Sequence, residues 1–197
     1  MIKRTMDIIL AVIGILFVTP IFLMIAVAIK IEDPKGKILF KQIRVGKDGK
    51  TFWMYKFRSM VSDADKKLQD LLHLNETSGA LFKMKDDPRV TKVGKFIRRT
   101  SLDELPQFVN VLRGEMSMVG PRPSLPREVA EYSAYDLQRL KVVPGCTGLW
   151  QVSGRSTIDF KGMVELDLTY IRQRSVWLDI KLIFRTVGVL VGTKDAY

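Results

Sequence analysis

Two adjacent acids, Asp103 and Glu104, stand out in a chain whose net charge is +11. Ser101 and Glu104 form a capping-box pattern that predicts the start of a helix, and the apolar residues that follow predict that it continues to Gly114. The positive end of the helix dipole would favour the ionised form of both acids. Ionised carboxylates among cations suit two tasks, binding a divalent metal ion and attacking a phosphorus atom. The alternative is an ordinary helix N-terminus, where acids are common.

Basic residues that suit phosphate binding surround this acidic pair in the sequence. Arg99 precedes the pair, Arg122 follows it between two prolines, and Arg155 ends a glycine-rich segment. Lys56 and Arg58 alternate along a predicted strand and would therefore share one face. A guanidinium in a rigid loop can bind two phosphate oxygens with little loss of entropy. The alternatives are a solvated edge strand for Lys56 and Arg58, and an irregular structural loop for Arg122.

The elements that must position these residues begin with an apolar N-terminal segment. Residues 8–29 contain no charged side chain, and as a helix of about 33 Å they would be long enough to cross a bilayer. However, Thr19 and Pro20 lie near the middle of this segment, and Lys or Arg residues flank both of its ends. These features predict a helix that breaks at Pro20 and returns to the same side of the membrane, with Thr19 bonded to a freed carbonyl. The alternative is a single transmembrane span.

The rest of the chain predicts a mostly helical α+β fold. Residues 37–45 and 51–60 alternate as strands of a small β-hairpin, and helices are expected over 62–75, 91–99, 125–142, 158–172 and 176–191. The last helix is apolar over a broad arc and is predicted to lie on the membrane surface, with a buried core helix as the alternative. We therefore expect a membrane hairpin over residues 1–36 and a catalytic domain over 37–197, with several amphipathic helices at the membrane around the active site.

Composition excludes several kinds of site. The chain has one Cys and one His, which excludes an internal disulfide and any Cys-rich or His-rich metal site. The net charge of +11 indicates a polyanionic partner: nucleic acid, an anionic membrane surface or a phosphate-bearing substrate. No Walker or Rossmann pattern is present.

Six motifs, in this order, resemble the bacterial sugar transferase family, the monotopic phosphoglycosyl transferases, in their minimal catalytic form. They are Thr19-Pro20 in the apolar segment, Tyr55-Lys56-Phe57-Arg58-Ser59-Met60, Asp87-Pro88-Arg89-Val90-Thr91, Thr100-Ser101-Leu102-Asp103-Glu104-Leu105-Pro106-Gln107, Val119-Gly120-Pro121-Arg122-Pro123 and Gly148-Leu149-Trp150-Gln151-Val152-Ser153-Gly154-Arg155. The chain departs from the family pattern at Cys146, where a branched apolar residue is expected, and at Thr19, where Ser is usual.

The resemblance implies transfer of a sugar phosphate from a UDP-sugar to polyprenyl (undecaprenyl) phosphate, which releases UMP and begins the synthesis of a bacterial glycan. It implies that Asp103 is the nucleophile, that Asp103 and Glu104 hold Mg²⁺, and that Arg122, Lys56, Arg58, Arg155 and Arg99 bind phosphate. Gln151, Asp167 and Tyr170 match family positions near the site. The implied location is the bacterial cytoplasmic membrane, among lipids and facing the cytoplasm.

Some expectations go beyond the motifs. Galactose or glucose is the expected sugar, a homodimer is one assembly that this interpretation allows, and no nucleic acid is expected as a partner. One rival interpretation is a membrane-tethered, non-enzymatic binder of nucleic acid, although the cations are scattered and no nucleic-acid motif is present. Another is a lipid phosphatase or a different metal-dependent phosphotransferase that uses the same acids.

Overall fold

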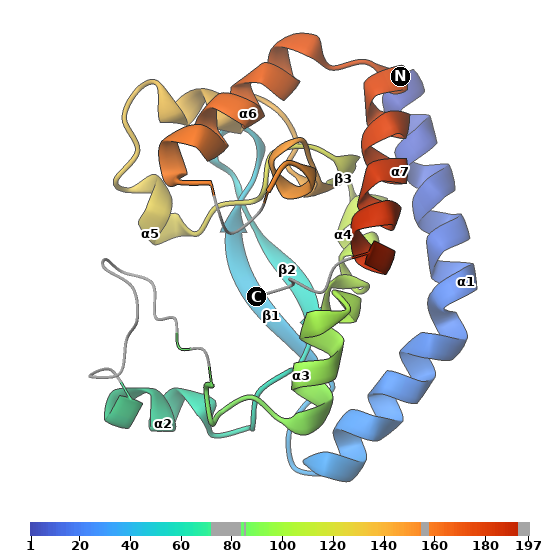
Figure 1. The fold of residues 1–197 in the computed structure, drawn as a ribbon, viewed down its shortest axis with the longest axis vertical. Coiled ribbons are helices and arrows are strands. Elements are labelled where there is room, and N and C mark those ends of the chain that lie inside the picture. The colour runs from blue at the N-terminus through green and yellow to red at the C-terminus, as the bar shows by residue number, and fades with distance from the viewer. Residues whose placement is uncertain (72–83, 85, 155–157, 193–197) are drawn as a thin grey trace.

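A computed structural model describes residues 1–71, 84, 86–154 and 158–192 (Figure 1). The first element, α1 (Ile2–Glu32), is one long helix that curves along the outside of the body. It is long and apolar enough to cross a membrane. The helix continues through Pro20, so the structure does not confirm the predicted break at this residue or the fold-back into a hairpin.

The predicted role of Thr19 is also corrected. Its hydroxyl donates to the carbonyl of Ile15 over 2.7 Å, which is the carbonyl one turn before Thr19 itself. Pro20 has no amide proton, so the carbonyl that loses its helical partner is that of Leu16. Thr19 therefore reinforces the turn before Pro20 and does not replace the missing bond.

Polar contacts bind both ends of α1 to the same folded body. Near its start, the Arg4 guanidinium donates to the carbonyls of Val111 and Leu112, and the Asp7 carboxylate accepts from Ser117 and Met118. Near its end, the Glu32 carboxylate accepts from the backbone amides of residues 92 and 93. The whole helix is thereby fixed against the rest of the chain.

The predicted β-hairpin is confirmed. Strands β1 (Leu39–Val45) and β2 (Thr51–Phe57) pair antiparallel and are joined by the 3₁₀ turn η1 (Lys47–Gly49). Asp48 and Gly49 have positive φ angles of 55° and 78°, a conformation that a tight turn requires and that Gly adopts without strain. Lys56 lies opposite Phe40 and Met54 opposite Gln42, so these four residues share one face of the hairpin.

The remaining elements are mostly short helices. In chain order they are α2 (Ala64–Leu71), α3 (Lys92–Arg99), η3 (Leu102–Glu104), α4 (Gln107–Arg113), β3 (Ser117–Val119), α5 (Pro126–Val129), η4 (Asp136–Lys141), β4 (Gly145–Thr147), η5 (Trp150–Val152), α6 (Phe160–Gln173) and α7 (Val176–Gly192). The helices predicted over 91–99, 158–172 and 176–191 are confirmed, whereas the single helix predicted over 125–142 is wrong. Residues 117–119 and 145–147 form a parallel pair that the sequence did not indicate.

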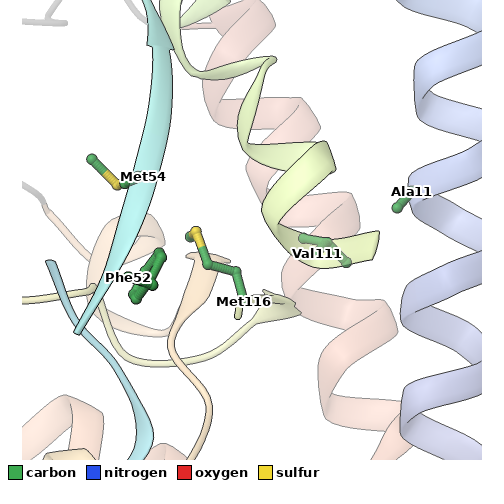
Figure 2. Packing of buried hydrophobic residues seen from close by; sticks show 5 residues of the cluster. All are labelled: Ala11, Phe52, Met54, Val111 and Met116. Atoms are coloured by element: carbon green, nitrogen blue, oxygen red, sulfur yellow. The ribbon is translucent and has the colours of Figure 1, made fainter. Parts of the chain in front are cut away.

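One core cluster joins the hairpin to α1 (Figure 2). Phe52 and Met54 of β2 pack with Met116 and with Val111 of α4, and this cluster extends to Ala11 of α1. On the same helix, Gly14 faces the ring of Phe108, where an added Cβ would lie only 2.8 Å from a ring carbon. Small residues on α1 thus let α4, which follows the acidic pair, approach this helix closely.

Candidate functional site

The acidic pair lies in the 3₁₀ turn η3, which precedes helix α4. Ser101 has a φ angle of 54° and its side chain makes no capping hydrogen bond, so the predicted capping box is wrong. The chain leaves α3 through this left-handed residue, turns once, and begins α4 only at Gln107, after Pro106. The predicted end of α4 is confirmed, because Gly114 has a φ of 81°. Asp103 and Glu104 are therefore fixed by a tight turn between two helices.

Lys56 of β2 binds both acids. Its Nζ lies 2.6 Å from Oε1 of Glu104 and 3.7 Å from Oδ2 of Asp103. Asp103 is only 9% exposed, and its burial raises the pKa of the carboxyl, while Lys56 acts in the opposite direction. This differs from the expectation that a helix dipole would favour the ionised form. A cation held against the acids is what keeps a buried carboxylate available for attack.

A cavity of about 1400 Å³ opens above this cluster. Its lining includes cations and polar groups, namely Lys56, Arg44, Arg58, Arg98, Arg122, Gln107 and Gln151. It also includes apolar side chains, among them Leu105, Phe108, Met118, Ile183 and Val187. The wall formed by α7 adjoins side chains that face outward, since Phe184 is 73% exposed. The cavity can thus accept a ligand that has both anionic and apolar parts.

Three of the predicted phosphate ligands line the cavity, and two are not placed there. Lys56, Arg58 and Arg122 lie on its wall, although the Arg58 guanidinium is already bonded to the Asp33 carboxylate. Arg99 is exposed and is not a lining residue; its neighbour Arg98 lines the cavity and donates to Ser59 Oγ over 2.8 Å. Adjacent residues on a helix point about 100° apart, so only one of the two can face the site. Arg155 lies outside the described residues.

Tyr170 and Asp167 hold the loop that carries Arg122 and do not line the cavity. The buried Tyr170 hydroxyl donates to the Val119 carbonyl over 3.0 Å, at the start of this loop. Asp167 accepts from Arg139 over 2.7 and 2.8 Å, and Arg139 in turn donates to Tyr132.

The hydrogen bonds that run from Asp167 through Arg139 to Tyr132 continue to the loop of Arg122. The Tyr132 hydroxyl donates to Ser124 Oγ over 2.7 Å, directly after the segment with the two prolines. Arg122 itself is exposed, and its guanidinium lies 5.7 Å from the ring centre of Trp150. Two buried hydrogen-bond chains, one at each end, therefore keep this loop in place.

Three lining residues were missed in the sequence: Arg44, Arg98 and Gln107. The alternation that placed Lys56 on one strand also applies to its partner strand, and it would have placed Gln42 and Arg44 on the cavity face. Gln107 is 4% exposed and begins α4, so only the end of the turn η3 brings it to the site. For Arg98 there was no signal that distinguished it from Arg99.

Within the ranges that the structure describes, no group of three or more His, Cys, Asp or Glu side chains is placed to bind a metal ion. Asp103 and Glu104 match in number the one or two carboxylates that typically hold Mg²⁺, whose shell is completed by water and substrate phosphates. The Lys56 ammonium already contacts both carboxylates.

Comparisons with known proteins place these features in a family. The model of the bacterial sugar transferase family matches residues 1–193. A galactosyl transferase CpsE of Streptococcus agalactiae is 50% identical over 97% of this chain and 42% of its own length. An undecaprenyl-phosphate galactose phosphotransferase of Salmonella typhimurium is 43% identical over 99% of this chain and 41% of its own length. The exopolysaccharide production protein ExoY of Rhizobium meliloti is 37% identical over the whole chain and 88% of its own length.

The chain spans only about two fifths of the first two of these relatives and nearly all of the third. The family model covers α1, the hairpin, the acidic turn and the loop of Arg122. The chain therefore belongs to the bacterial sugar transferase family.

Proposed function

We propose that this chain transfers a sugar phosphate from a UDP-sugar to undecaprenyl phosphate, which gives undecaprenyl-diphosphate-sugar and UMP. The observation that carries the proposal is the buried Asp103, held beside Lys56 and Glu104 in a cavity that both cations and apolar side chains line. The names of relatives support the substrate class, since one is an undecaprenyl-phosphate galactose phosphotransferase. The names also favour UDP-galactose as the first donor to assay, with UDP-glucose second.

The mechanism has two displacements at phosphorus. A carboxylate oxygen of Asp103 attacks the phosphorus that bears the sugar, the bond to the UMP oxygen breaks, and an aspartyl phosphosugar forms. A phosphate oxygen of the lipid then attacks the same phosphorus, and the bond to Asp103 breaks to restore the carboxylate. In each step the total charge of the reactants equals that of the products. The same site serves the soluble UDP-sugar in the first step and the lipid acceptor in the second.

The surrounding groups stabilise charge on the transferred phosphoryl group. Lys56 offsets the repulsion between an anionic nucleophile and an anionic substrate, and Arg98 and Arg122 are further cations of the cavity lining. Glu104, 43% exposed, would hold Mg²⁺ together with Asp103, and the ion would supply further neutralisation of the phosphate oxygens. Turnover should stop in EDTA and return with added Mg²⁺.

The contacts at the ends of α1 support a re-entrant placement in the membrane. Both ends bind to the body that carries Asp103, so both would lie on the same side of the bilayer as that residue. Between them, Leu16 and Phe17 are 69% and 80% exposed and would face the lipid acyl chains. The bent helix would thus enter and leave one leaflet of the cytoplasmic membrane, with the cavity at the lipid boundary.

Cysteine labelling tests this topology. In a Cys146→Ser background, Ile2→Cys and Lys35→Cys introduce thiols just before and just after the apolar stretch. A membrane-impermeant maleimide added to inverted inner-membrane vesicles should label both positions. Labelling of only one of them would establish a transmembrane span instead.

Trapping of the covalent intermediate tests the activity. Wild-type protein incubated with labelled UDP-galactose and Mg²⁺, without lipid acceptor, should release UMP and retain the labelled sugar phosphate after denaturation. Hydroxylamine should remove the label, because it cleaves acyl phosphates. Asp103→Asn should show neither label nor turnover; normal turnover of this variant would refute the assignment of the nucleophile. Release of free phosphate in place of UMP would indicate a phosphatase, and salt-dependent DNA binding without UMP release would indicate a nucleic-acid binder.

A further inference from the structure

Arg44 is a buried cation on the cavity wall, and within the described residues no carboxylate forms an ion pair with it. It is 6% exposed. Its Nη1 donates to the Pro123 carbonyl over 3.1 Å, and its Nη2 donates to Gln42 Oε1 over 2.7 Å. Its Nε has no hydrogen-bond partner among the residues that the structure describes. A guanidinium has five N–H donors, so the observed bonds leave donors unused.

Burial of the Arg44 guanidinium is unfavourable unless an anion offsets the cost of removing its charge from water. Arginine almost never lies in a protein interior without a partner, because removing the charge from water costs several kcal/mol. Here burial, and then the nearby Arg122, lower the pKa of Arg44 to about 10, although Glu128 and Glu104 act in the opposite direction. Arg44 therefore stays charged at neutral pH, and a bound anion would offset the cost of burying that charge and use the free donors. The other cations of the cavity are better satisfied, since Lys56 binds the two acids and Arg58 binds Asp33.

The position of Arg44 separates it from the acidic pair. Arg44 lies on the cavity face of the hairpin, four residues from Phe40, and Phe40 lies opposite Lys56. Four residues of a strand extend about 14 Å, so Arg44 and Lys56 stand at two ends of one face. Arg44 instead contacts the loop of Arg122, because the carbonyl that it binds belongs to Pro123. Arg44 is therefore bonded to the residue that follows Arg122, and the charge of Arg122 is near enough to lower the pKa of Arg44.

We propose that Arg44 and Arg122 form a second phosphate-binding subsite, distinct from the cluster of Lys56, Asp103 and Glu104. Its ligand is a phosphate monoester, which two guanidinium groups can bind through several charge-assisted hydrogen bonds. The inference rests on the proposed function, because that function brings two such compounds to the cavity. One is UMP, the leaving product, and the other is the lipid acceptor phosphate.

The test compares variants of the full chain in detergent micelles. Binding of UMP and of uridine is measured by calorimetry, and stabilisation by undecaprenyl phosphate and by undecaprenol is measured by thermal unfolding. Arg44→Gln should weaken the binding of at least one phosphate compound by about 10- to 100-fold, as loss of a charged hydrogen-bonding group predicts. Binding of uridine and of undecaprenol, which lack the phosphate, should not change.

Matched variants isolate the effect. Arg174→Gln removes the same charge from an exposed residue after α6 that is not a lining residue, and it should bind all four compounds like the wild type. If Arg44→Gln fails to fold, Arg44→Lys is tested in its place. Lysine keeps the positive charge but lacks the planar guanidinium that binds two phosphate oxygens at once, so this variant should still bind the phosphate less tightly.

Comparison of UMP binding with undecaprenyl phosphate binding identifies which compound occupies the subsite. A loss confined to UMP assigns the subsite to the nucleotide, and a loss confined to undecaprenyl phosphate assigns it to the acceptor. Wild-type binding of both compounds by folded Arg44 variants would overturn the subsite and leave the proposed function intact. Absence of UMP binding and UMP release in the wild type would instead overturn the proposed function and, with it, this inference.

Discussion

Lys3 in the first turn of α1 forms an ion pair with Asp179 of α7, with Nζ and Oδ2 2.6 Å apart. Asp179 is 1% exposed, and its Oδ1 lies 2.7 Å from the Tyr170 hydroxyl. Lys3 donates to the Val119 carbonyl, from which the loop of Arg122 begins, and the Tyr170 hydroxyl lies 3.0 Å from the same carbonyl oxygen. The start of α1 is thus connected directly to the loop that carries Arg122 at the cavity.

Lys3→Met should therefore destabilise the protein and disturb the site. Loss of its hydrogen bonds to a buried carboxylate and a carbonyl predicts a decrease of about 1.5–3 kcal/mol in the free energy of unfolding. Chemical denaturation in detergent measures this decrease, and KM for the UDP-sugar should rise as the loop shifts. Lys181→Met on the exposed side of α7 is the control. Equal stability of the two variants would contradict the proposed connection.

Lys56→Met should reduce catalysis more than folding. Without the ammonium group, Asp103 and Glu104 repel each other and the substrate phosphates, so kcat/KM for UMP release should fall by about 10²- to 10³-fold. Lys56→Arg should recover part of this loss, and Lys50→Met, on the exposed turn of the hairpin, should have no effect. Activity of Lys56→Met within a factor of two of the wild type would rule out this role.

Gly145→Ala should disrupt the loop of Arg122 through the backbone. An added Cβ would overlap the Gly120 amide nitrogen and the Val119 carbonyl carbon, neither of which can move as a flexible side chain does. We expect a loss of about 1–3 kcal/mol of stability or more, with weakened substrate binding. Gly188→Ala in α7 meets no atom within 4 Å and should be neutral or slightly stabilising. Unfolding curves of both variants check this contrast.

Asp167 should make stability depend on pH in a defined direction. Burial raises the pKa of its carboxyl from 3.8 to about 6, against the opposing effect of Arg139. A raised pKa in the folded state favours stability below pH 4, and this contribution is lost as the pH rises through 6. Because a tenfold change in proton affinity corresponds to about 1.4 kcal/mol, the full change is about 3 kcal/mol. The stability difference between wild type and Asp167→Asn should shrink accordingly between pH 4 and pH 6; a constant difference would show that Asp167 titrates normally.

The sequence alone predicted those helices and strands whose formation depends on residues close together in the chain. Alternation predicted the hairpin, and helical periodicity predicted α3, α6 and α7. The end of α4 was predicted from Gly114, because only the special φ of this residue is needed there. The beginning of the same helix was not, because Ser101 adopts a left-handed conformation imposed by the end of α3, which no capping pattern encodes.

By itself, the sequence determined the family motifs, the apolar helix and the adjacent acids, since these follow from residue types and short periodicities. Only the tertiary structure decided that α1 continues through Pro20 with both ends bound to the body, that Lys56 pairs with the two acids, and that Arg98, not Arg99, lines the cavity. The same holds for Arg44 beside the loop of Arg122, and for Tyr170 and Asp167 as supports of that loop. These relationships join residues far apart in the chain, and which of them form depends on how the helices and the hairpin pack together.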